Sequence, residues 1–466
     1  MINPHIRDFV GKRVHMIGIG GSSMNGLAQM LLSQGYEVQG SDRGESQFTK
    51  RLKELGIDVK IGHNADNIEN ADMVIYSAAI KPDNVERVAA LGKGILQLER
   101  SVALGMLSSD YDEVVGIAGC HGKTTITSML ALISRMHHEK DPEHTTDATI
   151  HVGGYVDFLS GGVHVGGHEL FITEACEYVE SFLTLHPTIA LISNIDNDHL
   201  DYYGDMEHIV LAFKKYAALL SKDGLIIGCV DDHRVMDILS ESPCEKLTYG
   251  HKNADYVPDN IAVDELGNTA FDLVFRGKTL GRIELSVPGE HNMLNSIAAA
   301  SVALALCIPF CVIKEALNKY TLTRRRFELM GEKNGAKIYH DYAHHPSEIA
   351  STLQAAASIK HNRIIAVFQC NSYTRAKTLF IGDMTCMEKA DLVLVPDIYP
   401  GREVDTGIVH ARDMVEAINR SCGEGRALYI PTFEAINHHL DRYAKPGDII
   451  ITLGSGDVYE NTKKLI

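Results

Sequence analysis

Two glycine-rich turns constrain the fold of this chain more than any other feature. They lie at residues 18–21 and 116–122. Each follows a short apolar, β-prone run and precedes a helical run, which is the strand–turn–helix arrangement of parallel α/β sheets. Further strand-like runs alternate with helical segments along the rest of the chain. The sequence therefore predicts an α/β protein built on parallel sheets.

The length and the order of these segments predict three domains. The chain has 466 residues, and a domain typically takes about 100–200 of them. New series of strands and helices open near residues 108 and 324, so we expect domains at 1–107, 108–323 and 324–466. With 45% hydrophobic and 23% charged residues, the composition excludes intrinsic disorder.

The formal charge of −17 argues against nucleic acid as a general partner, because phosphate backbones bind net positive surfaces. An anionic ligand must then be held locally, by loops, helix N-termini and metal ions. The nine cysteines form no CxxC pair and are typical of a reducing cytoplasm. Residues 1–11 contain no apolar signal core.

One uncharged stretch, residues 296–313, has the minimum length of a membrane span. It is rich in alanine and is interrupted by Pro309. We therefore expect a buried helix over 292–307, and no membrane partner.

The second turn, Gly116-Ile-Ala-Gly119-Cys-His-Gly122-Lys123-Thr124, predicts a phosphate-binding loop. Its backbone N–H groups can surround phosphates, Lys123 can reach the terminal phosphates, and Thr124 can offer a hydroxyl to Mg²⁺. The strict P-loop pattern has a glycine at position 117, where this chain has isoleucine. The turn is therefore a variant of that loop.

The first turn, Gly18-Ile-Gly20-Gly21, is similar to a dinucleotide-binding fingerprint, although Ser23 stands where the third glycine would be. Asp42 follows the next strand, where a carboxylate can bind a ribose hydroxyl. This pattern favours NAD or another diphosphate ligand, with a plain tight turn as the alternative.

Carboxylates follow two further predicted strands. Glu174 ends one, and Asp196, Asp198 and His199 follow another. Oxygen ligands beside a phosphate loop suit Mg²⁺, while an imidazole is a less usual ligand for it. The alternative is a capped loop of solvated acids.

For three other clusters, the sequence leaves two interpretations open. Asn292 and Asn295 lie on one helical face and either read a base or cap the helix. The arginines at 324–326 either clamp phosphates or form a solvated charge run. Six histidines between 137 and 168 suggest a metal site or, more simply, a solvated loop.

Taken in order, these motifs resemble the Mur ligase family over essentially the whole chain. The matching segments are Gly18-Ile-Gly-Gly-x-x-Met24, Gly119-x-His-Gly-Lys-Thr-Thr125, Glu174-Ala-Cys-Glu-Tyr178, Asn194-x-x-x-Asp198-His199-x-Asp201, His291-Asn-x-x-Asn295, Arg325-Arg-Phe327 and Asp341-Tyr-Ala-His-His-Pro346.

The resemblance implies a UDP-binding Rossmann-like domain, a central P-loop ATPase domain and a Rossmann-like C-terminal domain. It is nearest to the branch that joins L-alanine to the lactyl carboxylate of UDP-N-acetylmuramate in peptidoglycan precursor synthesis. ATP would activate the carboxylate as an acyl phosphate, which the amine of alanine attacks. The enzyme would be a cytoplasmic monomer or homodimer that closes around its substrates.

The resemblance also implies the roles of single residues. Catalytic roles fall to Lys123, Glu174, His199, Arg326 and His344. Metal ligands would be Thr124, Glu174 and His199. ATP would contact Gly119, Cys120, His121, Gly122, Lys123, Thr124, Thr125, His291, Asn292, Asn295, Arg325 and Asp341. UDP would contact Gly18, Gly20, Gly21, Ser22, Ser23, Asp42, His63 and Ser77, and the amino acid would contact Tyr342, His344 and Arg375.

Two departures from the family pattern leave questions open. Cys120 replaces a threonine, and a thiol whose pKa falls beside Lys123 would be sensitive to oxidation. Cys370-Asn371-Ser372 replaces a segment with Pro and His, which leaves selectivity among L-alanine, glycine and L-serine unresolved.

Three other functions compete with this interpretation. A recycling ligase that attaches a whole tripeptide has similar motifs, although residues 397–403 favour the alanine enzyme. A nucleotide-binding relic would have lost Lys123, Glu174, His199 and Arg326, which are all present. A dehydrogenase would explain only the first turn.

Overall fold

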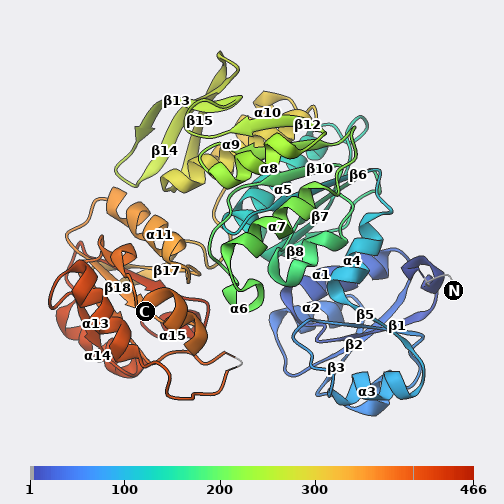
Figure 1. The fold of residues 1–466 in the computed structure, drawn as a ribbon, viewed down its shortest axis with the longest axis horizontal. Helices are drawn as coiled ribbons and strands as arrows, with labels where there is room; N and C mark the ends of the chain where they lie inside the picture. Colours follow the sequence, from blue (N-terminus) through green and yellow to red (C-terminus); the bar gives the residue numbers. More distant parts are fainter. Residues whose placement is uncertain (1–4, 402) are drawn as a thin grey trace. The chain divides into compact units, whose positions relative to one another are not determined.

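The computed structural model describes residues 5–401 and 403–466, without the side chain of Asp201. Residues 1–4 of the N-terminal segment, Arg402 in segment 397–403 and the Asp201 side chain lie outside the description. Two compact units are present and are described separately: residues up to Val257 with Ser296–Ala316, and Pro258–Asn295 with Leu317–Ile466. Figure 1 colours the ribbon along the sequence and labels many of the helices and strands.

The first sheet belongs to the first unit and is entirely parallel, as predicted. Its strand order is β3-β2-β1-β4-β5. The strands are β1 (Arg13–Ile17), β2 (Glu37–Asp42), β3 (Asp58–Ile61), β4 (Met73–Tyr76) and β5 (Leu96–Glu99). Helices α1 (Ser22–Ser33), α2 (Gln47–Glu54), α3 (Val85–Gly92) and α4 (Arg100–Ser108) connect or follow them. The reversal of strand order between β1 and β4 is where open α/β sheets bind ligands.

The second sheet of this unit contains the order β12-β11-β10-β6-β9-β7-β8. The strands are β6 (Glu113–Ala118), β7 (Thr149–Val156), β8 (Gly161–His164), β9 (Leu170–Glu174), β10 (Ile189–Ile192), β11 (Leu225–Cys229) and β12 (Glu245–Tyr249). All these neighbours are parallel except β7 and β8. The accompanying helices are α5 (Lys123–Lys140), α6 (Leu200–Tyr203), α7 (Met206–Ala217) and α8 (His233–Glu241).

The second unit contains a hairpin and a third sheet. Antiparallel β14 (Asn268–Phe275) and β15 (Lys278–Pro288) form the hairpin, after β13 (Tyr256–Val263). The third sheet has the order β16-β17-β21-β18-β19-β20. Its strands are β16 (Glu328–Lys333), β17 (Ala336–Asp341), β18 (Ile364–Phe368), β19 (Leu392–Val395), β20 (Ala427–Tyr429) and β21 (Ile449–Leu453), with α11 (Pro346–Ser358), α12 (Tyr373–Arg375), α13 (Ala411–Cys422), α14 (Phe433–Tyr443) and α15 (Val458–Thr462).

The predicted parallel strands are present, with bounds within a few residues of those expected. The antiparallel strands were not predicted. Among the described residues, β7–β8, β14–β15 and β16–β17 are antiparallel pairs. The sequence predicted the parallel strands of the α/β sheets but not these pairs. β16 alternates poorly between buried and exposed positions, so its sequence lacks the period-2 signal of a half-buried strand.

The uncharged stretch 296–313 forms two helices rather than one. Helix α9 (Glu290–Ala305) and α10 (Phe310–Lys319) are separated at Pro309. Ile297, Ala298 and Val302 on α9 are buried, which confirms the predicted core helix. Within the described ranges, no helix combines the length and apolar composition that a bilayer span requires.

Candidate active site

The second glycine turn joins β6 to α5 and adopts a backbone path that only glycine tolerates. Gly119 has φ +134° and Gly122 has φ +87°. A Cβ on Gly119 would lie 2.0 Å from Ser193 Oγ. The loop therefore folds as a tight cradle that ends at the N-terminus of an 18-residue helix, where backbone N–H groups favour anions.

Lys123, the first residue of α5, lies folded over this cradle. Its Nζ donates to the carbonyls of Gly119 (2.5 Å) and Cys120 (3.1 Å) and lies 2.8 Å from Glu177 Oε2. Burial is the largest single effect on Lys123 and lowers its pKa, but the charge of Glu177, its hydrogen bond and the nearby Cys176 and Cys120 together outweigh it, so the net pKa is raised. The ammonium is therefore charged and already present where terminal phosphates would be expected.

The sequence left open whether Lys123 activates the Cys120 thiol. Burial raises its pKa well above the usual value, and Glu177 raises it further, against the smaller opposing effect of Lys123. Its Sγ accepts from the N–H of Asp196 and lies 3.4 Å from the Asp196 carbonyl. The pKa therefore does not fall beside Lys123, and the thiol holds the Asp196 loop against the cradle.

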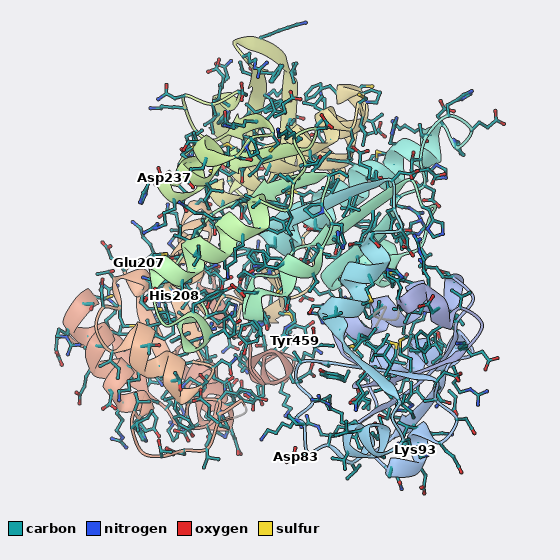
Figure 2. The ribbon with its side chains drawn as sticks, turned by 45° about the vertical axis from the view of Figure 1, so that its right-hand side comes forward. Asp83, Lys93, Glu207, His208, Asp237 and Tyr459 are labelled. Atoms are coloured by element: carbon teal, nitrogen blue, oxygen red, sulfur yellow. The ribbon has the colours of Figure 1, made fainter. Side chains whose placement is uncertain are left out.

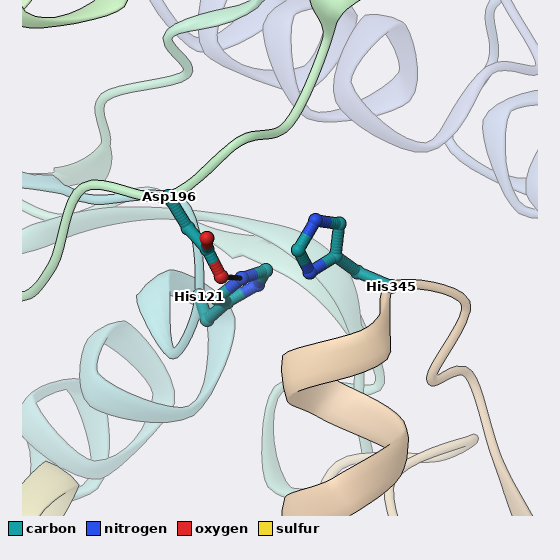
Figure 3. A group of neighbouring side chains, drawn as sticks. All are labelled: His121, Asp196 and His345. Carbon is teal, nitrogen blue, oxygen red and sulfur yellow. Dashed lines mark hydrogen bonds and ion pairs between the residues drawn. The ribbon is translucent and has the colours of Figure 1, made fainter. Parts of the chain in front are cut away.

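His121 is fixed by the same loop. Its Nε2 lies 3.0 Å from Asp196 Oδ2, and its backbone N–H donates to Asn194 Oδ1. Figure 3 draws the contact between His121 and Asp196 as a dashed line. The His121 side chain is thus oriented before any ligand binds.

A second group of ligating side chains lies beside Lys123. Atoms of Glu177, Asp198 and His199 all lie within 4.8 Å of one another, and His199 Nε2 is 3.6 Å from Glu177 Oε1. Two carboxylates and one imidazole are a donor set that fits a divalent cation. The sequence had suggested His199 but not Glu177. The signal was present, because Glu177 is the second acid of the Glu174-Ala-Cys-Glu segment.

The other two predicted metal ligands are Glu174 and Thr124. Glu174 Oε1 accepts from the backbone N–H of Gly153 at 2.6 Å. Thr124 lies in the first turn of α5, half-buried, and Thr125 beside it is buried.

Among the described residues, none of the six histidines of segment 137–168 joins a group of three ligating side chains. His164 instead lies 2.8 Å from Asp147.

The first glycine turn lies at the reversal of strand order in the first sheet. Gly18 has φ +78°, and the N–H of Ser77, at the end of β4, donates to the Ile17 carbonyl. The N–H of Gly20 donates to Asp42 Oδ2 at 2.9 Å. Gly18, Gly20, Asp42 and Ser77 are thus brought to the carboxyl edge of the strands, where the sequence placed them.

The two serines that follow this turn contact the second sheet. Ser22 Oγ donates to the Gly153 carbonyl (2.5 Å), and Ser23 Oγ lies 3.1 Å from His151 Nε2. Arg100 also donates to Ser23 Oγ at 3.0 Å. The contacts of His151 and Arg100 with Ser23 carried no sequence signal, because both depend on how distant segments pack.

A buried carboxylate supports the first turn from behind. Glu86 on α3 is 0% exposed and accepts from Ser41 Oγ (2.6 Å) and Asn67 Nδ2 (2.5 Å). Burial alone would raise its pKa, but hydrogen bonds from His15, Ser41 and Asn67 prevail and lower the pKa to about 2. His63 Nδ1 lies 3.0 Å from Ser41 Oγ, so the predicted UDP contact at His63 is held by the same network.

In the second unit, the three predicted amino-acid contacts lie together. Arg375 Nη1 donates to the His344 carbonyl at 3.4 Å, and the rings of Tyr342 and His344 are 5.1 Å apart. His344 Nδ1 lies 2.9 Å from the Tyr342 carbonyl. A carbonyl only accepts, so Nδ1 carries the proton, and Nε2 of neutral His344 is the basic nitrogen.

The segment with the unusual residues 370–372 adjoins this group. Asn371 Nδ2 donates to Ser455 Oγ at 2.8 Å, and Ser372 accepts from the N–H of Arg375. Ser372 has φ +75°, which is uncommon for a residue with a side chain. The segment therefore sets the position of Arg375.

Two predicted ATP contacts of the second unit, Arg325 and Asp341, are held by neighbouring residues. The Arg325 guanidinium lies 4.6 Å from the Tyr342 ring centre and 5.0 Å from that of Tyr459, which is labelled in Figure 2. Asp341 accepts from the N–H groups of Phe327 (2.8 Å) and Ala343 (2.7 Å). Burial raises the pKa of Asp341 to about 6 although Arg326 opposes the shift.

The remaining predicted ATP contacts, His291, Asn292 and Asn295, lie at the start of α9. Asn292 is buried and its Nδ2 donates to the Pro288 carbonyl at 2.7 Å, so this amide fixes the first turn of the helix. Burial and the charge of Arg326 lower the pKa of His291 to about 4. Asn295 is half-buried one turn further on.

Three family models match successive parts of the chain. They are the Mur ligase family catalytic domain (residues 13–112), the Mur ligase middle domain (117–303) and the Mur ligase glutamate ligase domain (325–456).

Curated relatives match nearly the full length. UDP-N-acetylmuramate–L-alanine ligase from Acetivibrio thermocellus is 44% identical over 96% of this chain and 94% of its own. The enzyme of the same name from Alkaliphilus metalliredigens is 42% identical over 96% and 95%.

Solved structures show the same architecture. UDP-N-acetylmuramate–alanine ligase from Thermotoga maritima has a TM-score of 0.79 and 25% identity, with coverage of 97% of this chain and 98% of that one. A murein peptide ligase from Psychrobacter arcticus, at 23% identity, shares the fold with a TM-score of 0.71 over 98% of both chains. With the three-domain α/β fold and these relatives, the chain belongs to the Mur ligase family.

Proposed function

We propose that this protein is an ATP-dependent ligase that joins L-alanine to the lactyl carboxylate of UDP-N-acetylmuramate in the cytoplasm. The observation that carries the proposal is Lys123, charged and held over the glycine cradle beside Glu177. The names of the full-length relatives supply the substrates. The domains of this ligase are 1–107 for the nucleotide sugar, 108–323 for ATP and 324–466 for the amino acid.

The reaction begins with phosphoryl transfer. A carboxylate oxygen of the muramyl group attacks the γ-phosphorus of ATP, and ADP leaves with the electron pair of the broken P–O bond. Lys123 exchanges its contact with Glu177 for the transferring phosphoryl oxygens, where a preorganised cation stabilises the developing charge. Mg²⁺, when bound, supplies further positive charge there, and Glu177, Asp198 and His199 fit it, with Thr124 and Glu174 as additional candidates.

The amide then forms at the acyl carbon. The amine of alanine attacks, loses a proton, and inorganic phosphate leaves. Because His344 Nδ1 donates its proton in a hydrogen bond to the Tyr342 carbonyl, its Nε2 is the group we assign to accept the proton of the amine. Arg375 is suited to the amino-acid carboxylate, since a guanidinium binds carboxylates with two parallel hydrogen bonds.

A tripeptide-adding ligase is the second candidate, since a murein peptide ligase shares the fold. Phosphate release from ATP should be measured with Mg²⁺ and UDP-N-acetylmuramate, with L-alanine, glycine, L-serine or murein tripeptide in separate reactions. We expect release that depends on L-alanine, with a product heavier by one alanyl residue. Release with tripeptide alone would favour the recycling reaction, and no release with any acceptor would overturn both.

A further inference from the structure

The first two residues of α1 are bonded to β7. Ser22 Oγ donates to the Gly153 carbonyl at 2.5 Å, and Ser23 lies against His151, with Nε2 3.1 Å from its Oγ and 3.3 Å from its carbonyl. These bonds connect the turn that follows β1 with a strand of the second sheet. Both elements belong to the first compact unit.

β7 in turn is bonded to the end of β9. The N–H of Gly153 donates to Glu174 Oε1 at 2.6 Å, and His151 Nδ1 lies 3.3 Å from Thr173 Oγ. Two adjacent hydrogen-bonded paths therefore run from α1 through β7 to β9. The first path ends on the carboxylate of Glu174.

The packing along these paths leaves little freedom. A Cβ on Gly153 would lie 2.8 Å from Glu174 Oε2, and a Cβ on Gly26 of α1 would lie 2.7 Å from His151 Cδ2. His151 is 3% exposed. Burial, with a smaller effect of Arg100, lowers its pKa to about 4, so the ring is neutral and bridges without charge.

We propose that Ser22 is a positioning residue that acts through Gly153 on the Glu174 carboxylate. A diphosphate bound at the first glycine turn fixes the start of α1, and Ser22 transmits that order to Glu174 beside the phosphate cradle. The nucleotide sugar and the nucleotide–divalent-cation complex then bind cooperatively. This inference rests on the proposed function, because it takes the first turn as the site of the nucleotide sugar.

The coupling is tested by titration calorimetry on the full chain. The affinity for the β,γ-imido analogue of ATP with Mg²⁺ is measured with and without saturating UDP-N-acetylmuramate. For the parent protein we expect the nucleotide sugar to increase this affinity about 10-fold, within the usual range of coupling between sites. In Ser22→Ala we expect the factor to fall to about 2 or less, whereas Ser22→Thr, which keeps the hydroxyl, should retain it.

The control is Ser33→Ala at the opposite end of α1, where the hydroxyl donates to the local Met30 carbonyl; it should leave the factor unchanged. A factor that is unchanged in Ser22→Ala, or a parent factor near 1, would overturn the inference. Those results leave the proposed function intact. Failure of the parent protein to bind UDP-N-acetylmuramate would instead overturn the proposed function itself.

Discussion

Two glycine turns of the same local design are supported by buried carboxylates in different ways. Behind the first turn, the ionised Glu86 carboxylate is stabilised by hydrogen bonds from residues of the first sheet and its helices. Beside the second turn, Glu177 is paired with Lys123, the cation that the expected ligand requires. The first carboxylate therefore stays satisfied when a ligand binds, and the second must give up its partner.

This difference indicates how the two sites work. The first turn is preorganised, since Ser41 both donates to Glu86 and accepts from the N–H groups of Gly18 and Ile19. At the second turn, the cost of releasing Glu177 must be met by the incoming charges. A divalent cation at Glu177, Asp198 and His199 would satisfy the carboxylate that Lys123 leaves.

The largest expected effect is that of Lys123→Ala. Loss of the ammonium should lower kcat by about 10²–10³-fold, as for other groups that stabilise transition-state charge. It should also lower the free energy of unfolding by about 3–5 kcal/mol, because Glu177 is left buried without its ammonium partner. Steady-state kinetics and urea unfolding measure the two effects.

The matched control is Lys140→Ala, at the other end of α5. Lys140 is paired with Glu315 at the surface, and an exposed pair contributes about 1 kcal/mol or less. Equal losses in both variants would show that Lys123 has no special role.

Substitution of one glycine in each turn tests the two sites separately. Gly119→Ala forces a Cβ against Ser193, and Gly20→Ala forces one to 2.6 Å from Thr49. We expect each change to weaken binding of its own ligand about 10–100-fold, ATP for Gly119 and UDP-N-acetylmuramate for Gly20, at a strain of about 1–3 kcal/mol.

Gly44→Ala is the control, because a Cβ there meets nothing within 4 Å. Binding of each nucleotide is followed separately by calorimetry. A Gly20 variant that loses ATP affinity while it keeps UDP-N-acetylmuramate affinity would contradict the assignment of the two turns.

The acid stability of the first turn depends on Glu86. Because its pKa is lowered from 4.5 to about 2, the carboxylate stabilises the fold above pH 4.5, and this contribution is lost as the pH falls toward 2. Glu86→Gln should therefore cost about 3 kcal/mol near neutral pH, and the difference from the parent should shrink on acidification.

The free energy of unfolding is measured by urea titration at several pH values. Glu54→Gln on the exposed end of α2 is the control and should change it by less than about 1 kcal/mol. A Glu86 effect that grows as the pH falls would have the wrong sign for this account.

The smallest effect is expected at Cys120. Because burial raises its pKa, the thiol should resist peroxide, and Cys120→Thr should lose activity to peroxide as fast as the parent does. The exposed Cys311 should be alkylated before it, as read by peptide mass mapping. Protection by the Cys120 substitution would show that the thiol is reactive after all.

Much of the fold was predictable because its signals are local. The two turns, the apolar strands before them and the helix over 292–307 are encoded in short segments, and the structure confirms them. The antiparallel strands were not predictable in this way. β16 exposes parts of both faces at the edge of a sheet, so no regular alternation marks it.

For the site, too, only the residues that belong to local motifs could be predicted. Gly119, Lys123 and His199 follow from motifs, but Glu86 looks like an ordinary charged residue at the start of an amphipathic helix, and only the packing of α3 buries it. His151 and Arg100 meet Ser23 across long stretches of sequence. Contacts of this kind depend on tertiary packing, which local sequence patterns do not reveal.

The most direct test of the account follows the oxygen atoms of the reaction. UDP-N-acetylmuramate labelled with ¹⁸O in its lactyl carboxylate is incubated with ATP, Mg²⁺, L-alanine and the enzyme, and the inorganic phosphate is analysed by mass spectrometry. Activation as an acyl phosphate predicts that one carboxylate oxygen appears in the phosphate for each amide formed. Phosphate without ¹⁸O, at the same yield of alanyl product, would contradict the phosphoryl transfer that Lys123 is proposed to support.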